Sequence, residues 1–400
     1  MKRQEFKEQL AQSPLLLDGA MGTVLHGRGI PIGECFDAIS LNDPALVADI
    51  HRRYIAAGAD IIETNSFGAN RFKLAQHGLE EQVQTINAAA VAVARRAIES
   101  WFRTVYLAGS VGPLGVRLAP LGRVPVSDAE EAFAEQIAAL VATPADMPGG
   151  RGVDLIVLET IPDLEEMAAA VRAARRVAPD IPVVGMIAFT RDDITLLGDS
   201  PAHVADYLAG LDLDALGVNC SSGPVQVLRL IAAIHERLPD IPLSASPNAG
   251  WPQQQEGGRV LYPATPAYFA GYARAFVEAG ARLIGGCCGT TADHIAAMRQ
   301  ALDEPQSEVT AITPHRARSG RERLAIAAAD QPTRLIQAFD RRQFVVTVEM
   351  SPPRGISARR LLAGARMLKE AGVGFIDVAD SPLARMRMSA WAAAHLVQKD

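Results

Sequence analysis

Cysteine is scarce in this sequence of 400 residues: only Cys35, Cys220, Cys287 and Cys288 occur. Four thiols are far too few for a disulfide scaffold, so we expect a reducing cytoplasm in which they stay free for a metal or for catalysis. No apolar run approaches the roughly 18 residues that a membrane-spanning helix needs. The short apolar stretch after the basic N-terminus carries Asp18, so we expect neither a membrane anchor nor a signal peptide.

Positive charge is also in short supply, because 39 Lys and Arg residues stand against 45 Asp and Glu residues. The formal net charge of −6 favours neither nucleic acid nor an anionic membrane surface as a partner. With 49% hydrophobic and 21% charged residues, the composition is typical of a globular protein. A chain of this length can bury a large core and form more than one domain.

What the sequence does contain is a regular alternation of short apolar runs and Ala-rich amphipathic segments. The runs are near-continuous, as in parallel strands that are buried on both faces. They lie at 14–19, 60–65, 105–110, 154–160, 181–189, 215–220, 241–246 and 282–288. Eight such β-then-α units in about 300 residues predict a (β/α)8 TIM barrel. A doubly wound open sheet is the alternative, but no GxGxxG motif follows the first run.

Local signals predict helix starts, an insertion and domain boundaries. Asp43, Ser127 and Thr265 have the side chains of helix N-caps. The Pro- and Gly-rich residues 143–152 interrupt one unit and are expected to form a surface insertion. Beyond the barrel, which we assign to 1–302, the predicted parts are a polar linker at 303–334 and two further β/α units at 335–400. Two units cannot close a barrel, so the last part reads as the incomplete start of a second (β/α)8 barrel.

Three of the cysteines follow predicted strands. Cys220 ends the sixth run, and Cys287 and Cys288 end the eighth. Because alternate strands contribute to one layer of a barrel, these thiols can converge at its C-terminal mouth, where active sites of such barrels lie. The alternatives are buried small side chains and a strained vicinal disulfide. Cys35 has no partner at a strand end and is expected to be structural.

Three converging thiolates favour Zn2+, and they leave its fourth tetrahedral position open for a substrate. A substrate thiol bound there would ionise at neutral pH. The resulting thiolate is a nucleophile toward an activated methyl group. This chemistry predicts methyl transfer to a small thiol.

Five motifs, in this order and at these spacings, resemble the homocysteine S-methyltransferase family. They are DGAMGT at 18–23, ETNSFGANR at 63–71, VLETIPDLEE at 157–166, GVNCSSGP at 217–224 and GGCCGT at 285–290. The resemblance covers residues 1 to about 300. It implies a (β/α)8 barrel whose zinc is held by Cys220, Cys287 and Cys288, and which uses homocysteine and a small methyl donor to make methionine.

The same resemblance implies how the amino-acid end of the substrate is held. Asp18 and Glu159 match positions that bind the α-ammonium group. Backbone amides are suitable donors for the α-carboxylate, and the candidates are Gly19, Ala20 and Met21. Weaker candidates for substrate contact are Glu63, Asn65 and Asn219. Asn248 fits a turn residue equally well.

The tail has a resemblance of its own. VVTVEMSPPRG at 345–355 is similar to the start of methylenetetrahydrofolate reductase, and Glu349 matches the glutamate that donates a proton in that family. The flavin-binding elements are missing, so we expect Glu349 to be idle here and FAD only in a full-length, bifunctional parent. No reductase activity is expected from residues 335–400.

Two other function classes stay open. One is a non-catalytic thiol- and zinc-binding barrel that serves a fused reductase, and the other is a metal-free barrel lyase or isomerase. The donor also stays open among S-methylmethionine, S-adenosylmethionine, betaine, methylfolate and methylcobalamin, with a sulfonium favoured. No sequence feature indicates an oligomeric state.

Overall fold

The computed structural model describes residues 1–142, 151–254, 260–304, 333–355, 357–379 and 387–399. The expected insertion at 143–152 and the linker at 303–334 lie almost wholly outside the described residues. The chain divides into two compact units, Met1–Ala317 and Arg318–Asp400. No described helix is both long and apolar enough to cross a membrane.

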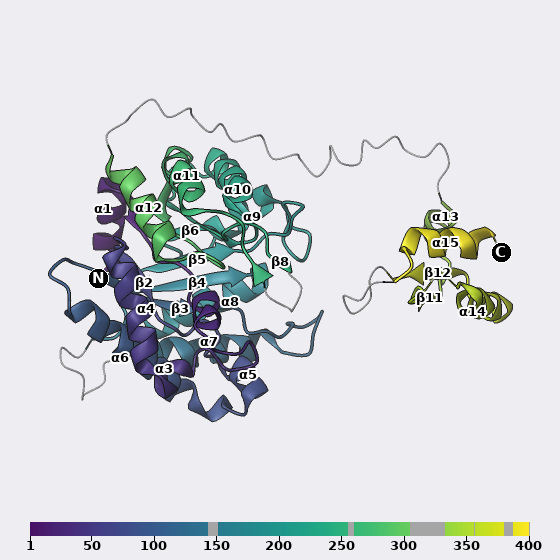
Figure 1. The fold of residues 1–400 in the computed structure, drawn as a ribbon, viewed down its shortest axis with the longest axis horizontal. Helices are drawn as coiled ribbons and strands as arrows, with labels where there is room; N and C mark the ends of the chain where they lie inside the picture. The colour runs from purple at the N-terminus through teal and green to yellow at the C-terminus, as the bar shows by residue number, and fades with distance from the viewer. Residues whose placement is uncertain (143–150, 255–259, 305–332, 356, 380–386, 400) are drawn as a thin grey trace. The chain divides into compact units, whose positions relative to one another are not determined.

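The first unit is a barrel of eight parallel strands, as the apolar runs predicted (Figure 1). The strands are β1 (Leu15–Leu16), β2 (Ile61–Glu63), β3 (Tyr106–Val111), β4 (Leu155–Ile161), β5 (Val183–Ile187), β6 (Ala215–Cys220), β7 (Leu243–Pro247) and β10 (Ala281–Ile284). Their order is β1-β10-β7-β6-β5-β4-β3-β2, and a parallel bridge from Leu17 to Ile61 joins β1 to β2. The doubly wound open sheet is therefore wrong.

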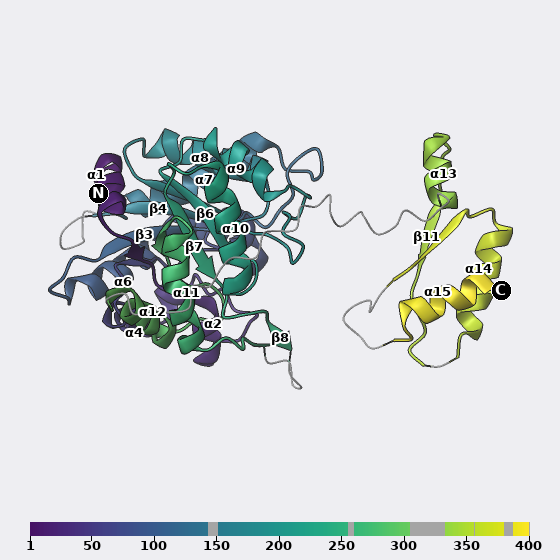
Figure 2. The same ribbon diagram turned by 90° about the horizontal axis from the view of Figure 1, so that it is seen from above.

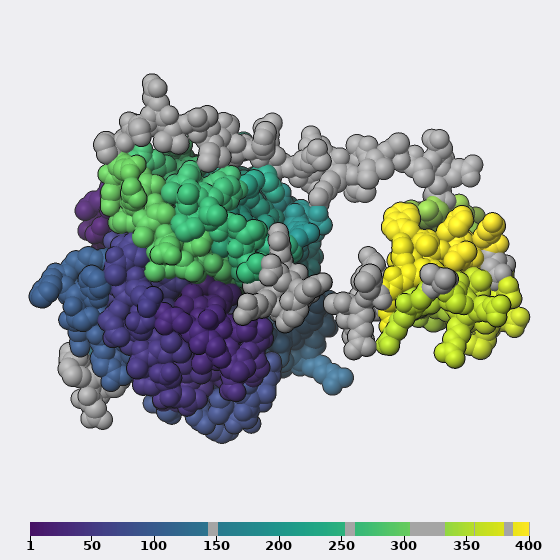
Figure 3. Space-filling view, viewed as in Figure 1, coloured from purple at the N-terminus to yellow at the C-terminus, as the bar shows by residue number. Residues whose placement is uncertain are grey.

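Helices follow the strands and cover the outside of the barrel, as the two ribbon views show (Figures 1 and 2). They are α2 (Gly22–Gly27), α3 (Ile39–Asn42), α4 (Pro44–Ala56), α5 (Arg71–Leu74), α6 (Val83–Glu99), α7 (Val126–Val141), α8 (Leu164–Val177), α9 (Pro201–Ala209), α10 (Pro224–Arg237), α11 (Pro266–Glu278) and α12 (Ala292–Asp303). A short antiparallel hairpin, β8 (Gln253–Gln254) and β9 (Val260–Leu261), follows β7. Strand β1 pairs in parallel with β10 inside the barrel, and on the surface the purple start of the chain lies against green residues (Figure 3).

The N-terminal helix α1 (Arg3–Gln12) covers the end of the barrel where the strands begin, which we call the lower end. Its Phe6 and Leu10 are fully buried and pack with inward-facing strand residues such as Leu155 and Val184. A charged hydrogen bond anchors the helix, because Arg3 donates to the buried Asp214 at 2.8 Å. Since α1 covers this end, we look for the chemistry at the opposite, upper end, where the carboxyl ends of the strands lie.

Two of the three predicted helix caps are confirmed. The Asp43 side chain accepts a hydrogen bond from the Leu46 amide at the start of α4, and Thr265 accepts from Tyr268 at the start of α11. Ser127 was predicted wrongly. Helix α7 begins one residue earlier, at Val126 after Pro125, and the Ser127 hydroxyl donates to the neighbouring Asp128 instead.

The second unit contains α13 (Arg334–Asp340), β11 (Thr347–Met350), α14 (Arg359–Glu370), β12 (Phe375–Val378) and α15 (Ala390–Lys399). Strands β11 and β12 pair in parallel, as the predicted β/α units require. Few of its described side chains are buried, among them Leu361 and Ala393, whereas Phe344 and Trp391 are exposed. Its sheet has two strands, too few for a packed core of ordinary size.

Candidate functional site

Three thiols meet at the carboxyl ends of β6 and β10. Cys220 is the last residue of β6, and Cys287 and Cys288 follow the end of β10 at Ile284. Their sulfur atoms all lie within 4.8 Å of one another, and all three are free, so no vicinal disulfide is formed. Two strands separated by β7 in the sheet thus bring together residues that lie far apart in the chain.

The backbone around the thiols has left-handed conformations and is held by backbone hydrogen bonds. Cys220 and Ser221 have φ angles of 55° and 51°, in the left-handed region that non-glycine residues seldom adopt. The Cys287 amide donates to the Pro247 carbonyl at 2.8 Å, and the Cys288 carbonyl accepts from the Ala249 amide at 2.8 Å. The last residue of β7 and the loop after it therefore hold Cys287 and Cys288, respectively.

Hydrogen bonds among the thiols distribute their protons unequally. Donation from Cys220 and Cys287 lowers the pKa of Cys288 to about 3. The pKa of Cys287 is raised well above its ordinary value, because its thiol bonds to Cys220 and Cys288 and is buried. Tyr262 adds a side-chain hydrogen bond to Cys288. A thiol with a lowered pKa ionises readily, and a thiolate in this cluster would favour a bound cation.

A single metal ion fits this donor set. Three sulfur atoms at such spacings can share a tetrahedral zinc ion, for which the Zn–S distance is about 2.3 Å. A further observation comes from Asn248, which is buried and hydrogen-bonded to Cys220. Its Oδ1 atom has no hydrogen-bond partner, which is unusual for a buried oxygen. The site thus has an unsatisfied acceptor oxygen beside three thiols.

Three carboxyl groups gather at the ends of β1, β2 and β4. Asp18 Oδ2 accepts from the Glu63 amide at 3.0 Å. The Glu159 carboxylate accepts from the Ser110 hydroxyl at 2.5 Å, and the Glu63 and Glu159 carboxyls share a hydrogen bond. Asp18 and Glu159 are only 3% and 8% exposed, which leaves them almost without water.

Burial raises the pKa of each of these acids. The pKa of Glu159 rises to about 7, mainly through desolvation. The pKa values of Asp18 and Glu63 rise well above their ordinary values through desolvation, and the neighbouring Glu159 charge adds to both shifts. Described basic side chains form no ion pair with any of the three. A cluster of this kind keeps protons when empty and favours a cationic ligand.

Asn219 connects the acids to the thiols. Its Nδ2 donates to Glu159 Oε2 at 3.0 Å and reaches Cys287 Sγ at 4.0 Å, while its Oδ1 accepts from the Thr160 amide at 2.7 Å. Thr160 has a φ of 58°, an uncommon conformation for a β-branched residue. Such strain is found at sites where the surroundings over-determine the backbone.

The other sequence candidates fall elsewhere. Asn65 is buried, but its Nδ2 donates to the Phe36 carbonyl and the Ser40 hydroxyl, so it ties a loop together. Cys35 is packed in an apolar cluster away from the thiols, in agreement with a structural role. Glu349 lies on the exposed strand β11 of the second unit.

The proposed carboxylate-binding amides are only partly free. The Ala20 amide donates to Thr290 Oγ1 at 3.1 Å, so it cannot also bind a substrate without breaking that bond. The Gly19 and Met21 amides have no hydrogen-bond partner among the described residues. Two residues that sequence reasoning missed therefore enter the site: Thr290, inside the GGCCGT motif, and Tyr54, whose hydroxyl donates to the Ala20 carbonyl at 2.6 Å.

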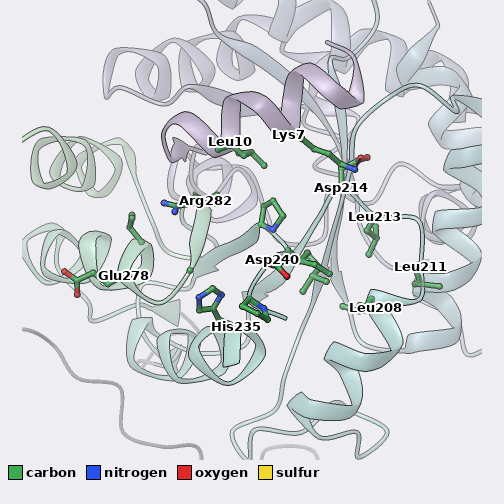
Figure 4. Close-up of a pocket in the computed structure, with 18 residues that line it drawn as sticks. Lys7, Leu10, Leu208, Leu211, Leu213, Asp214, His235, Asp240, Glu278 and Arg282 are labelled. Carbon is green, nitrogen blue, oxygen red and sulfur yellow. Dashed lines mark ion pairs between the residues drawn. The ribbon is translucent and has the colours of Figure 1, made fainter. Parts of the chain in front are cut away.

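A cavity of about 540 Å³ lies at the other end of the barrel. Figure 4 shows it between α1, which carries Lys7 and Leu10, and residues that precede strands, such as Asp214 and Asp240. None of the cysteines or buried acids of the upper end lines it. This cavity is therefore separate from the thiol and carboxyl clusters.

Comparisons with known proteins agree with this geometry. The sequence profile described as Homocysteine S-methyltransferase matches residues 15–302. Methionine synthases from Mycobacterium leprae and Mycobacterium tuberculosis are 31% identical over 311 and 318 residues. These matches cover 74% and 75% of this chain but 25% and 26% of the relatives, so the chain spans about a quarter of their length.

Solved structures give the same picture. The metallated form of the homocysteine methyltransferase MmuM from Escherichia coli is 30% identical, with a TM-score of 0.59 over 72% of this chain and 96% of that one. Its apo form is 29% identical, with a TM-score of 0.56 over the same shares.

Proposed function

Because the chain belongs to the homocysteine S-methyltransferase family, we propose that residues 1–302 transfer a methyl group to the thiol of L-homocysteine and release L-methionine. One observation carries the proposal: three thiols that can hold a metal stand beside three buried carboxyls that form no ion pair with a described basic side chain. Homocysteine has a thiol at one end and an ammonium at the other, which matches this pair of clusters.

In this proposal Cys220, Cys287 and Cys288 hold zinc. When bound, zinc would lower the pKa of the substrate thiol so that it reacts as a thiolate at neutral pH. The role of the chain is to keep the three sulfurs together, which the bonds to the loop after β7 support. A reducing cytoplasm would keep the thiols free.

The buried acids bind the α-ammonium group. Asp18, Glu63 and Glu159 offer oxygen acceptors in a site with little water, where a hydrogen bond to a charged group is strong. Binding of the ammonium favours their ionised forms and releases a proton at neutral pH, since the pKa of Glu159 is about 7 in the empty site. Asn219 positions Glu159 by donating to its Oε2. The Gly19 and Met21 amides are the remaining donors for the α-carboxylate.

We further propose that residues 303–334 are a linker and that 335–400 are the N-terminal fragment of a methylenetetrahydrofolate reductase-like domain. The parallel pair β11 and β12 with α14 between them supports a β/α unit of that kind. Reductase chemistry and FAD would belong to a longer parent protein. Glu349 in this fragment is idle.

Replacing Cys287 with Ala tests the thiol site. We expect the zinc content to fall from about one ion per chain to near zero and methionine formation to be lost. Cys35→Ala is the matched control, because it removes a thiol outside the cluster and should keep both zinc and turnover. Elemental analysis and a methionine assay measure the two results, and a metal-free Cys287→Ala variant with full activity would refute the proposal.

A panel of methyl donors tests the reaction itself. The full chain, loaded with zinc, is assayed with homocysteine and each of S-methylmethionine, S-adenosylmethionine, betaine, methylfolate and methylcobalamin. The donor that supports turnover identifies the co-substrate. Zinc and homocysteine binding without methionine from any donor would favour the non-catalytic thiol-binding barrel instead.

A further inference from the structure

Two segments of the site are fastened to each other by hydrogen bonds that sequence reasoning did not anticipate. One is residues 18–23 after β1, and the other is residues 286–290 after β10. Thr290 Oγ1 accepts from the Ala20 amide at 3.1 Å and donates to the Cys287 carbonyl at 2.7 Å. A single hydroxyl group thus joins the two segments.

Further bonds reinforce this junction. The Gly286 amide donates to the Asp18 carbonyl at 3.1 Å, and the Gly289 amide donates to Thr23 Oγ1 at 3.0 Å. From α4, the Tyr54 hydroxyl donates to the Ala20 carbonyl at 2.6 Å and lies 3.4 Å from the Thr290 carbonyl. Tyr54 therefore braces both segments from behind.

The junction is closely packed as well as hydrogen-bonded. Thr290 is fully buried, and Tyr54 is 1% exposed. A Cβ atom on Gly19 would lie 2.7 Å from Thr290 Oγ1, and one on Gly286 would lie 2.6 Å from the same atom. Both contacts are too short for a real side chain, so the two glycines allow the threonine to sit between the segments. The separation of the segments is thereby held with little freedom.

We propose that Thr290, braced by Tyr54, is a positioning residue that selects the thiol substrate by its chain length. This inference rests on the proposed function, in which the thiol end binds beside Cys287 and Cys288 and the amino-acid end binds beside Asp18. Because the segments carrying these groups are fastened together, the distance between the two ends is set by the protein. Cysteine is one methylene shorter than homocysteine and cannot satisfy both ends at once.

The discrimination resides in the rigidity of the junction. A pocket that merely lacks one methylene contact distinguishes substrates by about 10- to 200-fold. A flexible junction would let residues 18–23 and 286–290 approach each other and so accommodate cysteine. Loosening it should therefore reduce selectivity, and not only affinity.

The test compares Thr290→Val with Thr290→Ser in the zinc-loaded full chain. Valine has nearly the same shape but leaves the buried Ala20 amide without an acceptor, whereas serine keeps the hydroxyl. Titration calorimetry gives the Kd values for L-homocysteine and L-cysteine. We expect the preference for homocysteine to fall about tenfold or more in Thr290→Val and to be kept in Thr290→Ser. Zinc content should be unchanged in both.

A Thr290→Val protein that binds both amino acids more weakly but keeps the wild-type ratio of Kd values would overturn the proposal. If that variant does not fold, Tyr54→Phe takes its place, because it removes the bracing hydroxyl and keeps the ring. A smaller fall in the same ratio supports the proposal, and no fall contradicts it. Wild-type protein that turns over homocysteine yet binds cysteine equally well refutes the length selection alone. Wild-type protein that binds neither amino acid refutes the proposed function as well.

Discussion

The two ends of the barrel bury acidic side chains in opposite ways. At the lower end Asp214 is 2% exposed and forms ion pairs with Arg3 at 2.8 Å, Arg175 at 2.7 Å and Lys7 at 3.5 Å. At the upper end Asp18 is 3% exposed and is paired with no described cation, and its pKa is raised well above its ordinary value by desolvation. Two equally buried acids thus differ: the charge of Asp214 is neutralised by basic side chains, whereas Asp18 remains available to a cationic ligand.

This contrast separates stability from function. A second acid at the lower end, Asp154, is 3% exposed and also has cationic partners, with Arg95 at 2.9 Å and Arg151 at 2.7 Å. Such pairs hold the ends of strands to the helices around them. The upper acids do not gain that compensation, and burying an unpaired carboxyl is costly. We interpret this free-energy cost as one that the binding of a cationic ligand offsets.

The largest expected effect is on stability at the lower end. Asp214→Ala leaves Arg175, 13% exposed, without its buried partner, so we expect a loss of about 3 kcal/mol in the free energy of unfolding. Urea denaturation followed by circular dichroism measures it. The control is Asp212→Ala: Asp212 contacts the same Arg3 and Arg175 but is 58% exposed, and its loss should cost under about 1 kcal/mol. Equal losses in the two variants would contradict the contrast.

At the upper end we expect a substitution to weaken homocysteine binding and not to lower the free energy of unfolding. Glu159→Gln should weaken homocysteine binding by about 10- to 100-fold, because a charged acceptor for the ammonium is lost. The free energy of unfolding at pH 8 should stay equal or rise, since the variant no longer buries an ionised carboxylate. Calorimetric titration and urea denaturation measure the two quantities.

The matched control for this variant is Glu165→Gln, on the exposed side of α8. Glu165 accepts from the Tyr207 hydroxyl on the surface, so its replacement should leave homocysteine binding unchanged. A Glu159→Gln protein that binds homocysteine as the wild type does, or one that unfolds as readily as Asp214→Ala, would remove the distinction between the two ends.

The last expected effect depends on pH. Glu166, buried on α8, accepts from the Leu114 amide at 2.7 Å, and desolvation raises its pKa to about 7 from 4.5. Between these values the unfolded chain binds fewer protons than the folded one, so the Glu166 contribution to stability is present below pH 4.5 and is lost as pH rises through 7. Relative to the wild type, Glu166→Gln should gain up to about 3 kcal/mol across this window, because each pKa unit corresponds to about 1.4 kcal/mol. Urea denaturation at a series of pH values tests this, and a constant difference would contradict it.

Much of the fold follows from local pattern. Each of the eight apolar runs overlaps a strand of the barrel, because a parallel strand that is buried on both faces is apolar along most of its length. Asp43 and Thr265 cap helices as expected, since capping depends on neighbours within three residues. Ser127 fails for a reason that is also local: the helix begins at Val126, so the serine is already inside its first turn.

The site is less legible from sequence. Alternate strands explain why Cys220 can meet Cys287 and Cys288, but no spacing reveals that the Ala20 amide is occupied by Thr290, 270 residues away. Asn65 sits in a motif beside Glu63, yet its side chain turns to the loop at Phe36. Hydrogen-bond partners of this kind are chosen by three-dimensional proximity, which a motif does not encode.

By itself the sequence determined the eight strand–helix units, the order of the strand ends and the residue types offered at each of them, because burial and side-chain periodicity are local properties. The tertiary structure alone decided which buried acids have a cation beside them. Asp18 and Asp214 are both buried acids next to a barrel strand, but Arg3 reaches Asp214 across 211 residues and no described cation pairs with Asp18. Desolvation and pairing depend on what the fold brings within a few ångströms, so the difference between an ion-paired acid and an unpaired one emerges only there.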